Sequence, residues 1–210
     1  MTTSKGSTAL KLTTAKSSTT TTTTTTKESG LISLDYIYGF VYGVYNASIS
    51  QNSQELRYGD GFGGSPIDQT AVRACDGDIS TKYLTFGECN RGEIRLDCGL
   101  NTGFYMILKR GASLVTGLQI CTADDYPQRD PLKVSLEGSN QSVLNLTLGS
   151  SWTLIYNGDS GLNTDPGRQT CGMIQRFNNI IPYKSYRFLV SSKRGLENSV
   201  QYSELKLFEY

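Results

Sequence analysis

Apolar and polar residues alternate in several short segments of the second half of the chain. The segments LKVSLEG (132–138), SWTLIYNG (151–158) and SYRFLVSS (185–192) each show this pattern. A period of two places neighbouring side chains on opposite faces of a strand, so each segment is predicted to be a strand with one buried face. The predicted core side chains are Leu132, Val134, Leu136, Trp152, Leu154, Tyr156, Tyr186, Phe188 and Val190.

Turn-forming residues separate these predicted strands. The stretches GDGFGGSP, ADDYPQRDP, EGSNQS, NGDSGLNTDPGR and SKRGLENS each contain several Gly, Pro, Asn or Asp residues. No long segment with a helical period of 3.6 residues competes with the strands. The chain is therefore predicted to be all-β, and its strand spacing fits an antiparallel jelly-roll β-sandwich.

The last predicted strand, SVQYSELKLFEY, changes its buried face partway along. The apolar residues up to Tyr202 follow one parity, and those from Leu205 onward follow the other. A bulge, or a switch between sheets, at Ser203 and Glu204 would keep both sets of apolar side chains buried. The side chain of Glu204 would then point inward; the alternative is an ordinary solvated carboxylate.

The first 29 residues differ in composition from the rest of the chain. They are dominated by Ser, Thr and Lys and include an unbroken run of Thr over 19–26, which is too polar to form a core. We predict a disordered linker or stalk over 1–29, either O-glycosylated or unmodified, followed by one domain over 30–210. The apolar stretch over 31–45 is shorter than a membrane span and is predicted to form strand.

Composition limits the possible functions. A net charge of +1 and the absence of long runs of like charge argue against nucleic acid as a partner. The chain has no His, which excludes Ser-His-Asp and Cys-His catalysis. A carboxylate pair such as Asp124 and Asp130 could in principle hydrolyse glycosides, but a chain of this size has little room for a deep cleft. We therefore predict that the protein is not an enzyme.

Five Cys residues without closely spaced pairs favour disulfides over a zinc site. Cys89 and Cys98 could close a hairpin around NRGEIRLD, and the odd number leaves at least one thiol unpaired within the chain. Sequons at Asn46, Asn140 and Asn145 agree with an oxidising secretory route. We predict an extracellular setting, although no signal peptide is visible in this chain.

Four stretches together resemble the discoidin domain, also called the coagulation factor 5/8 C-terminal type, in the galactose-binding-like superfamily. They are ACDGDISTKYLTFG (74–87), VTGLQICTADDYPQRDPLKVSLEGSN (115–140), WTLIYNG (152–158) and SYRFLVSSKRGLENSVQYSELKLFE (185–209). The resemblance covers about residues 65–210. Two features depart from the family: Tyr83 stands where Trp is common, and the two terminal Cys of the blood-clotting members are not evident.

In carbohydrate-binding members, a loop resembling R-x-x-D-G-D-x-x-T and a Glu in the last strand hold a structural calcium ion. Calcium binds six to eight oxygen ligands, and three carboxylates would offset its charge. An ordinary Asp-Gly turn is the alternative interpretation of CDGDIST. The ligands implied by the resemblance are the Arg73 carbonyl, Asp76, Asp78, Thr81, the Ser203 carbonyl and the Glu204 carboxylate.

The resemblance implies a non-catalytic, extracellular module that binds a glycan through loops at one end of a sandwich. The stretch DDYPQRD offers an aromatic ring and several charged groups, as sugar recognition requires. Arg129 and Asp130 could instead form a buried ion pair that shapes this loop. The candidate ligand-binding residues are Asp124, Asp125, Tyr126, Arg129 and Asp130.

Adhesion is the alternative function. Domains of the same fold bind membrane phospholipid or protein partners through loops that carry large apolar residues at their tips. The candidates in this chain are Phe62 in GDGFGGSP and Leu162 in SGLNTD.

Overall fold

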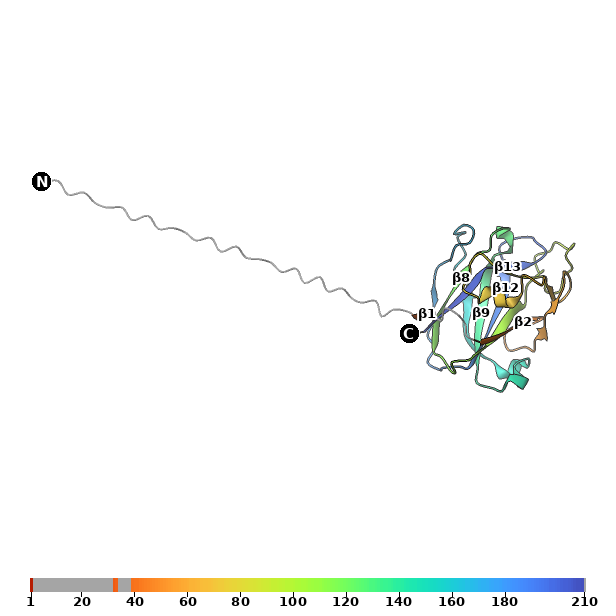
Figure 1. Cartoon of the computed structure of the whole chain (residues 1–210), viewed down its shortest axis with the longest axis horizontal. Coiled ribbons are helices and arrows are strands. Elements are labelled where there is room, and N and C mark those ends of the chain that lie inside the picture. Colours follow the sequence, from red (N-terminus) through yellow and green to blue (C-terminus); the bar gives the residue numbers. More distant parts are fainter. Residues whose placement is uncertain (2–31, 34–38, 210) are drawn as a thin grey trace.

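The computed structural model describes Met1, residues 32–33 and residues 39–209 (Figure 1). The predicted linker over 1–29 lies outside the described residues, apart from Met1. So do residue 31 and residues 34–38 of the apolar stretch over 31–45. The part of that stretch at Gly39–Tyr45 is a strand, as predicted. No helix among the described residues is long and apolar enough to cross a membrane.

Two main sheets form a β-sandwich, which confirms the predicted all-β fold. The longer strands pair antiparallel, and the helical elements are single 3-10 turns. One sheet has the order β10 (Thr153–Asp159), β9 (Pro131–Ser139), β12 (Ser185–Lys193), β7 (Thr102–Leu108), β2 (Gly39–Tyr45), β3 (Gln54–Glu55). The other has the order β1 (Ile32–Ser33), β14 (Glu204–Glu209), β8 (Val115–Cys121), β11 (Gln175–Arg176).

Two small sheets lie beside the main ones. The antiparallel pair consists of β6 (Tyr83–Thr85) and β13 (Val200–Tyr202), and the parallel pair consists of β4 (Arg57–Tyr58) and β5 (Gly64–Ser65). The 3-10 turns are η1 (Ala71–Ala74), η2 (Pro127–Arg129), η3 (Val143–Asn145) and η4 (Gly149–Ser151).

The six-stranded sheet is buried on both faces. Phe104 and Phe188 belong to the main core cluster, together with Leu118 and Leu205 from the four-stranded sheet. Tyr105, the neighbour of Phe104 along β7, must point to the opposite face because strand side chains alternate. There Tyr105 joins a second cluster that contains Val44, Ala47, Leu146, Trp152 and Leu189. Trp152 is thus a core residue, but it belongs to this second cluster and not to the main core.

Strand β10 departs from the simple alternation predicted for it. The pairing register between β10 and β9 shifts between Leu154 and Tyr156, as in a β-bulge. Consequently Ile155 and Tyr156 both pack against the main core, whereas Leu154 is exposed. The prediction that Trp152, Leu154 and Tyr156 share one buried face is therefore wrong.

The predicted break near Ser203 is a switch between sheets. β13 pairs with β6, whereas β14 pairs with β8, and Ser203 lies between them. This change of partner keeps Tyr202 and Leu205 in the same core despite their different parity. Glu204 is buried, as predicted for an inward-pointing side chain.

Strands β9 and β12 each run the length of the sandwich and so define its two ends. The upper end contains loops 122–130 and 194–199, with η2 at the top of Figure 1. The lower end contains loops 109–114, 139–145 and 176–184, with η3 below the sheets. Nine extended residues span roughly 30 Å, so the two ends are far apart.

Two disulfides cross-link the chain near the loops. Cys89 is bonded to Cys98, as the sequence suggested, and Cys121 on β8 is bonded to Cys171. The fifth cysteine, Cys75, is buried and free.

Candidate functional site

A polar cavity of about 380 Å³ opens at the upper end of the sandwich. Its walls come from loops far apart in the sequence, which the sandwich brings to one end. It is lined by Asp60, Pro66, Asp68, Gln69, Lys82, Leu84, Phe86, Arg91, Asp125, Tyr126, Arg129 and Asn198.

Lys82 fixes one wall of the cavity. Its Nζ lies 2.8 Å from Asp124 Oδ1 and 2.7 Å from Asp125 Oδ1. Gln201 Nε2 donates to the backbone carbonyl of Asp125 at 2.6 Å and to Asp125 Oδ1 at 2.8 Å. Partial burial works to raise the pKa of Asp125, but the hydrogen bonds from Lys82 and Gln201 hold that pKa below its usual value. The Asp125 carboxylate therefore stays ionised well into the acidic range.

Tyr126 presents a flat aromatic side chain beside these charges. It is 49% exposed, and its backbone adopts the left-handed conformation with φ of 39°. This conformation is strained for a residue with a side chain, and such strain is concentrated at functional sites. The guanidinium carbon of Arg129 lies 3.9 Å from the ring centroid of Tyr126, and Arg129 Nε and Nη2 donate to Glu197 Oε2 at 3.1 and 3.0 Å. The ring is thus held in place on one side.

Asp130 is held by ion pairs beside the cavity and does not line it. It is fully buried and accepts two hydrogen bonds from Arg168, at 2.9 and 2.7 Å, while Arg194 Nε lies 3.4 Å away. Burial raises the pKa of Asp130, against the opposing effect of Arg168. The ion pair considered between Arg129 and Asp130 does not form, because each has other partners. Of the five predicted residues, Asp125, Tyr126 and Arg129 line the cavity, and Asp124 lies next to it through Lys82.

Sequence reasoning missed several lining residues, notably Asp68, Gln69 and Asn198. Gln69 Oε1 is buried, and no hydrogen-bond donor reaches it among the described residues. Such a group is costly to bury without a partner and would accept a donor from a bound molecule. The lack of a recognisable motif around Gln69 explains why the sequence did not point to it.

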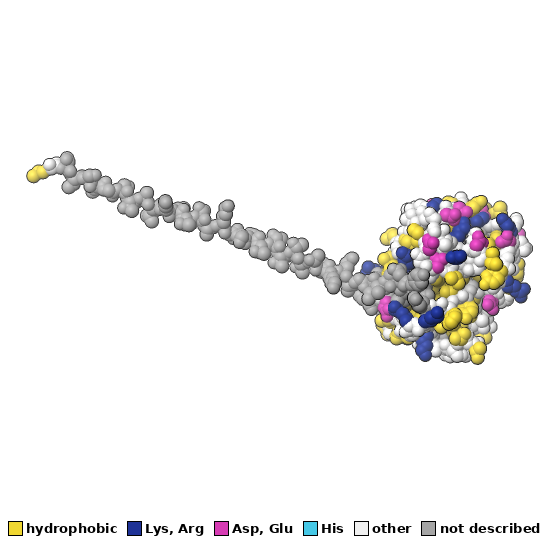
Figure 2. Space-filling view, viewed as in Figure 1, with side chains coloured by type: hydrophobic (Ala, Val, Ile, Leu, Met, Phe, Trp, Pro, Cys, Tyr) yellow, Lys and Arg dark blue, Asp and Glu magenta, His cyan; other side chains and the backbone are white. Residues whose placement is uncertain are grey.

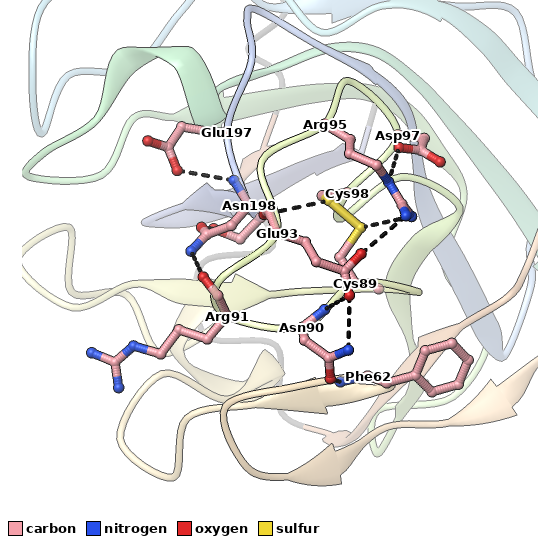
Figure 3. The surroundings of a disulfide bond; sticks show 12 residues. Phe62, Cys89, Asn90, Arg91, Glu93, Arg95, Asp97, Cys98, Glu197 and Asn198 are labelled. Atoms are coloured by element: carbon pink, nitrogen blue, oxygen red, sulfur yellow. Dashed lines mark hydrogen bonds and ion pairs between the residues drawn. A yellow bond between two sulfur atoms is a disulfide. The ribbon is translucent and has the colours of Figure 1, made fainter.

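The disulfide loop 89–98 supports another wall of the cavity (Figure 3). Asn198 Nδ2 donates to the Arg91 carbonyl at 2.7 Å, and the Asn198 backbone N–H donates to Glu197 Oε2 at 2.9 Å. Glu197 is the carboxylate that holds Arg129. The disulfide loop is therefore connected to the Tyr126 side of the cavity through Asn198 and Glu197.

The loop predicted to hold calcium gathers oxygen atoms around the Thr81 hydroxyl. Thr81 Oγ1 lies 2.9 Å from Asp76 Oδ2, 3.1 Å from the Asp78 carbonyl and 3.3 Å from the Arg73 carbonyl. A hydroxyl has one hydrogen to donate, so at most one of these three acceptors is well satisfied by Thr81. A set of converging carbonyl, carboxylate and hydroxyl oxygens has the chemistry that a hard cation requires.

Glu204 reaches the same loop from the last strand. The Gly77 backbone N–H donates to Glu204 Oε2 at 3.2 Å, and Gly77 has a φ of 79°, which favours glycine. Burial raises the pKa of the neighbouring Cys75 thiol, and the negative charges of Glu204 and Asp76 raise it further. Both carboxylates thus lie close to one buried point, and together they would match the double charge of calcium.

The Asp78 carboxylate does not face Thr81, whereas three carboxylate ligands were expected around the calcium ion. Its Oδ1 accepts hydrogen bonds from the Ser80 backbone N–H at 2.9 Å and from Ser80 Oγ at 2.6 Å, so it is the Asp78 carbonyl that faces Thr81. Ser203 is fully buried, and its N–H and Oγ donate to the carbonyls of Cys121 and Thr122. The assignment of the Ser203 carbonyl as a ligand stays a prediction.

Another group of potential metal ligands does not form a site. Cys89, Asp97 and Cys98 are the one cluster of Cys and acidic side chains in the described part of the chain that is tight enough for a metal ion. Both sulfur atoms belong to the disulfide and are unavailable as thiolates.

The two apolar residues proposed for adhesion have different surroundings. Leu162 is fully buried in the main core, so the prediction that it tips an exposed loop is wrong. Phe62 is exposed and packs edge-on against Tyr45, with ring centroids 5.7 Å apart. Of the two residues proposed for adhesion, Phe62 alone is exposed.

Comparisons with known proteins give matches of structure only. No protein-family model and no curated protein matches the chain. A family 32 carbohydrate-binding module of Clostridium perfringens NanJ, solved with galactose, has a TM-score of 0.53 and 13% identity over 84% of this chain and 98% of that chain. The module CBM32-3 from a family 31 glycoside hydrolase of Clostridium perfringens has a TM-score of 0.56 and 14% identity. The match covers 85% of this chain and 95% of that chain.

A third similar structure is CpGH89CBM32-5 from Clostridium perfringens, solved with GalNAc-beta-1,3-galactose. It has a TM-score of 0.53 and 12% identity, and covers 84% of this chain and 99% of that chain. At such low identity the similarity concerns the fold alone. The chain therefore shares the β-sandwich fold of these family 32 carbohydrate-binding modules.

Proposed function

We propose that this protein is a non-catalytic, extracellular glycan-binding module of the discoidin type, and that the upper cavity is its binding site. The observation that carries the proposal is the pairing of an exposed, rigidly held Tyr126 ring with fixed polar groups in one cavity. Similar structures solved with galactose and with GalNAc-beta-1,3-galactose support it. The two disulfides agree with an oxidising compartment.

The lining residues suit the two sides of a sugar ring. The C–H face of the sugar would lie on the Tyr126 ring, which is apolar and partly exposed. Gln69 Oε1 and the Asp68 carboxylate would accept hydrogen bonds from sugar hydroxyls, while Arg129 would donate to them. Because Lys82 and Gln201 hold Asp125 in place, its carboxylate is already oriented before a sugar binds.

Calcium has a structural role in this proposal. The oxygens of Arg73, Asp76, Asp78 and Thr81, with the Glu204 carboxylate, would hold the ion and join the 73–81 loop to β14. The residue after Thr81 is Lys82, whose ammonium group fixes Asp125 at the cavity. Calcium would therefore stabilise the wall of the sugar site without contacting the sugar.

The proposal is tested by isothermal titration calorimetry with galactose, N-acetylgalactosamine and a panel of other neutral sugars. We expect Tyr126→Ala and Gln69→Ala each to raise the Kd for the bound sugar by about tenfold or more, because each removes a contact within a small ligand site. Phe40→Ala is the matched control, since Phe40 is an exposed aromatic residue away from the cavity. Failure of every sugar to bind, or equal binding by wild type and Tyr126→Ala, would contradict the proposal.

A further inference from the structure

A second hollow lies next to the upper cavity. It has a volume of about 540 Å³ and is lined by Tyr58, Gly59, Asp60, Pro66, Ile67 and Asp68. Asp60, Pro66 and Asp68 also line the upper cavity, so the two hollows are adjacent and share part of their walls. A ligand that extends beyond the upper cavity on this side would reach the second hollow next.

Two exposed apolar side chains line the second hollow. Tyr58 is 76% exposed and Ile67 is 79% exposed, both more than Tyr126 in the upper cavity. An aromatic ring beside carboxylate acceptors is the same combination that the upper cavity offers around Tyr126, and it suits a sugar ring in the same way. Tyr58 precedes residues 65–210, the part that resembles the discoidin domain, so that resemblance implies nothing about this ring.

Hydrogen bonds hold the backbone on both sides of the second hollow. Tyr58 belongs to β4, which pairs with β5, and the Gly59 N–H donates to the Ser65 carbonyl at 2.9 Å. Ser65 is buried, and its Oγ donates to the Leu84 carbonyl of β6 at 2.6 Å. The Tyr58 backbone is therefore fixed to the sandwich before any ligand binds, which lowers the entropy cost of binding.

The second hollow is acidic. Asp60 and Asp68 line it, and no Lys or Arg does. Asp60 pairs with Arg91 of the disulfide loop at 2.6 Å, whereas the Asp68 side chain has no ion pair or hydrogen bond among the described residues. Most Asp and Glu side chains visible in Figure 2 also lie in the upper half of the globular part. A carboxylate accepts hydrogen bonds from sugar hydroxyls but repels the carboxylate of an acidic sugar.

We propose that Tyr58 and Ile67 form a second sugar subsite, so that the protein recognises two or more linked neutral sugars and discriminates against uronic and sialic acids. This inference rests on the proposed function, because the first sugar occupies the upper cavity beside Tyr126. The second sugar lies with its C–H face on Tyr58. The Asp68 carboxylate, which lines both hollows, accepts hydrogen bonds from hydroxyls of the linked sugars.

The second subsite is tested by isothermal titration calorimetry of the full chain with galactose, α-1,4-galactobiose and GalNAc-β-1,3-galactose. We expect the better of the two disaccharides to bind about tenfold more tightly than galactose, because it also contacts the second hollow. Tyr58→Ala should abolish this gain and leave the Kd for galactose unchanged, whereas Tyr126→Ala should weaken both. Phe62→Ala is the matched control, since Phe62 is an exposed aromatic residue close to Tyr58 in sequence that lines neither hollow.

Digalacturonic acid tests the effect of charge, because it has the linkage of α-1,4-galactobiose but carries carboxylates. We expect it to bind about tenfold or more weakly than α-1,4-galactobiose, since Asp60 and Asp68 repel it. The difference should shrink as salt rises and should also shrink in Asp68→Asn. Each variant should keep the wild-type melting temperature, which shows that a change in affinity does not come from unfolding.

The possible failures are distinguishable. Equal affinity for galactose and both disaccharides, or unchanged disaccharide affinity in Tyr58→Ala, would overturn the second subsite and leave the upper cavity as a site for one sugar. Tighter binding of digalacturonic acid than of α-1,4-galactobiose would overturn the preference for neutral sugars. If no sugar binds at all, the proposed function fails, and the second subsite fails with it.

Discussion

Arg187 and Glu137 form an ion pair with both side chains fully buried, and Arg187 Nε lies 2.7 Å from Glu137 Oε2. Arg187 Nη1 donates to the Gln51 carbonyl at 2.9 Å, and the Ser50 N–H donates to Glu137 Oε1 at 2.9 Å. The guanidinium carbon lies 5.0 Å from the Trp152 ring. Two neighbouring strands, β12 and β9, thus hold the loop that follows β2 against the outer face of the sheet.

Loss of one partner of this pair should be strongly destabilising. We expect Arg187→Met to lower the free energy of unfolding by about 3–5 kcal/mol, because the Glu137 carboxylate stays buried without its partner. The double variant Arg187→Met with Glu137→Leu should be more stable than Arg187→Met, since it removes that buried charge. Urea unfolding measures both changes; a double variant less stable than the single one would contradict the explanation.

The two disulfides should differ in what they contribute. A bond that closes a longer loop restricts the unfolded chain more, so the Cys121–Cys171 bond, with a sequence separation of 50, should contribute about 4 kcal/mol. The Cys89–Cys98 bond, with a separation of 9, should contribute about 2.5 kcal/mol. We expect the paired Ser variants to differ accordingly in thermal unfolding. The Cys89 and Cys98 variant should weaken sugar binding more, because its loop supports Arg91 and Asn198.

The orientation of Asp78 distinguishes two acidic residues of the calcium loop. Asp76→Asn should abolish the rise in melting temperature caused by calcium, since the Asp76 carboxylate faces Thr81. Asp78→Asn should keep most of that rise, because Asp78 presents its backbone carbonyl to the same point. Differential scanning fluorimetry with calcium and with a chelator measures both. Equal loss in the two variants would show that the Asp78 carboxylate turns inward when calcium binds.

Lys193 should make stability depend on pH. Its buried Nζ donates to the carbonyls of Cys98, Glu197 and Ser199, and burial lowers its pKa to about 8. Since the folded pKa is below the unfolded value of about 10.4, the unfolded state binds more protons between these two pH values. The stability of the wild type relative to Lys193→Met should therefore rise as pH increases from about 8 to 10. A flat or falling difference in urea unfolding would contradict this.

Alternation of side chains predicted β9, β12 and the strands of the final segment, because burial of one strand face is encoded locally. The segment at Tyr186, Phe188 and Val190 forms β12 as expected, and the parity change after Tyr202 predicted the switch between sheets. The bulge in β10 escaped prediction, since the extra residue is set by pairing with β9, far along the chain.

The sugar site was less predictable than the fold. Tyr126, Asp125 and Arg129 lie close in sequence, so a local search for charged and aromatic residues could find them. Gln69 and Asn198 come from loops more than 50 residues away on either side, and their position depends on how the whole upper end packs. Asp130 showed the opposite error: its neighbours in sequence line the cavity, but its side chain points to Arg168.

The change of partner at Ser203 also bears on how the chain is made. During synthesis β6 and β8 leave the ribosome long before residues 200–209, and each lacks a neighbouring strand until this segment arrives. Neither the small sheet nor the four-stranded sheet is complete before then, and Tyr202, Leu205 and Leu207 are missing from the core. Folding of this sandwich is therefore expected to finish only once residues 200–209 have left the ribosome, with unpaired strand edges exposed to chaperones until that moment.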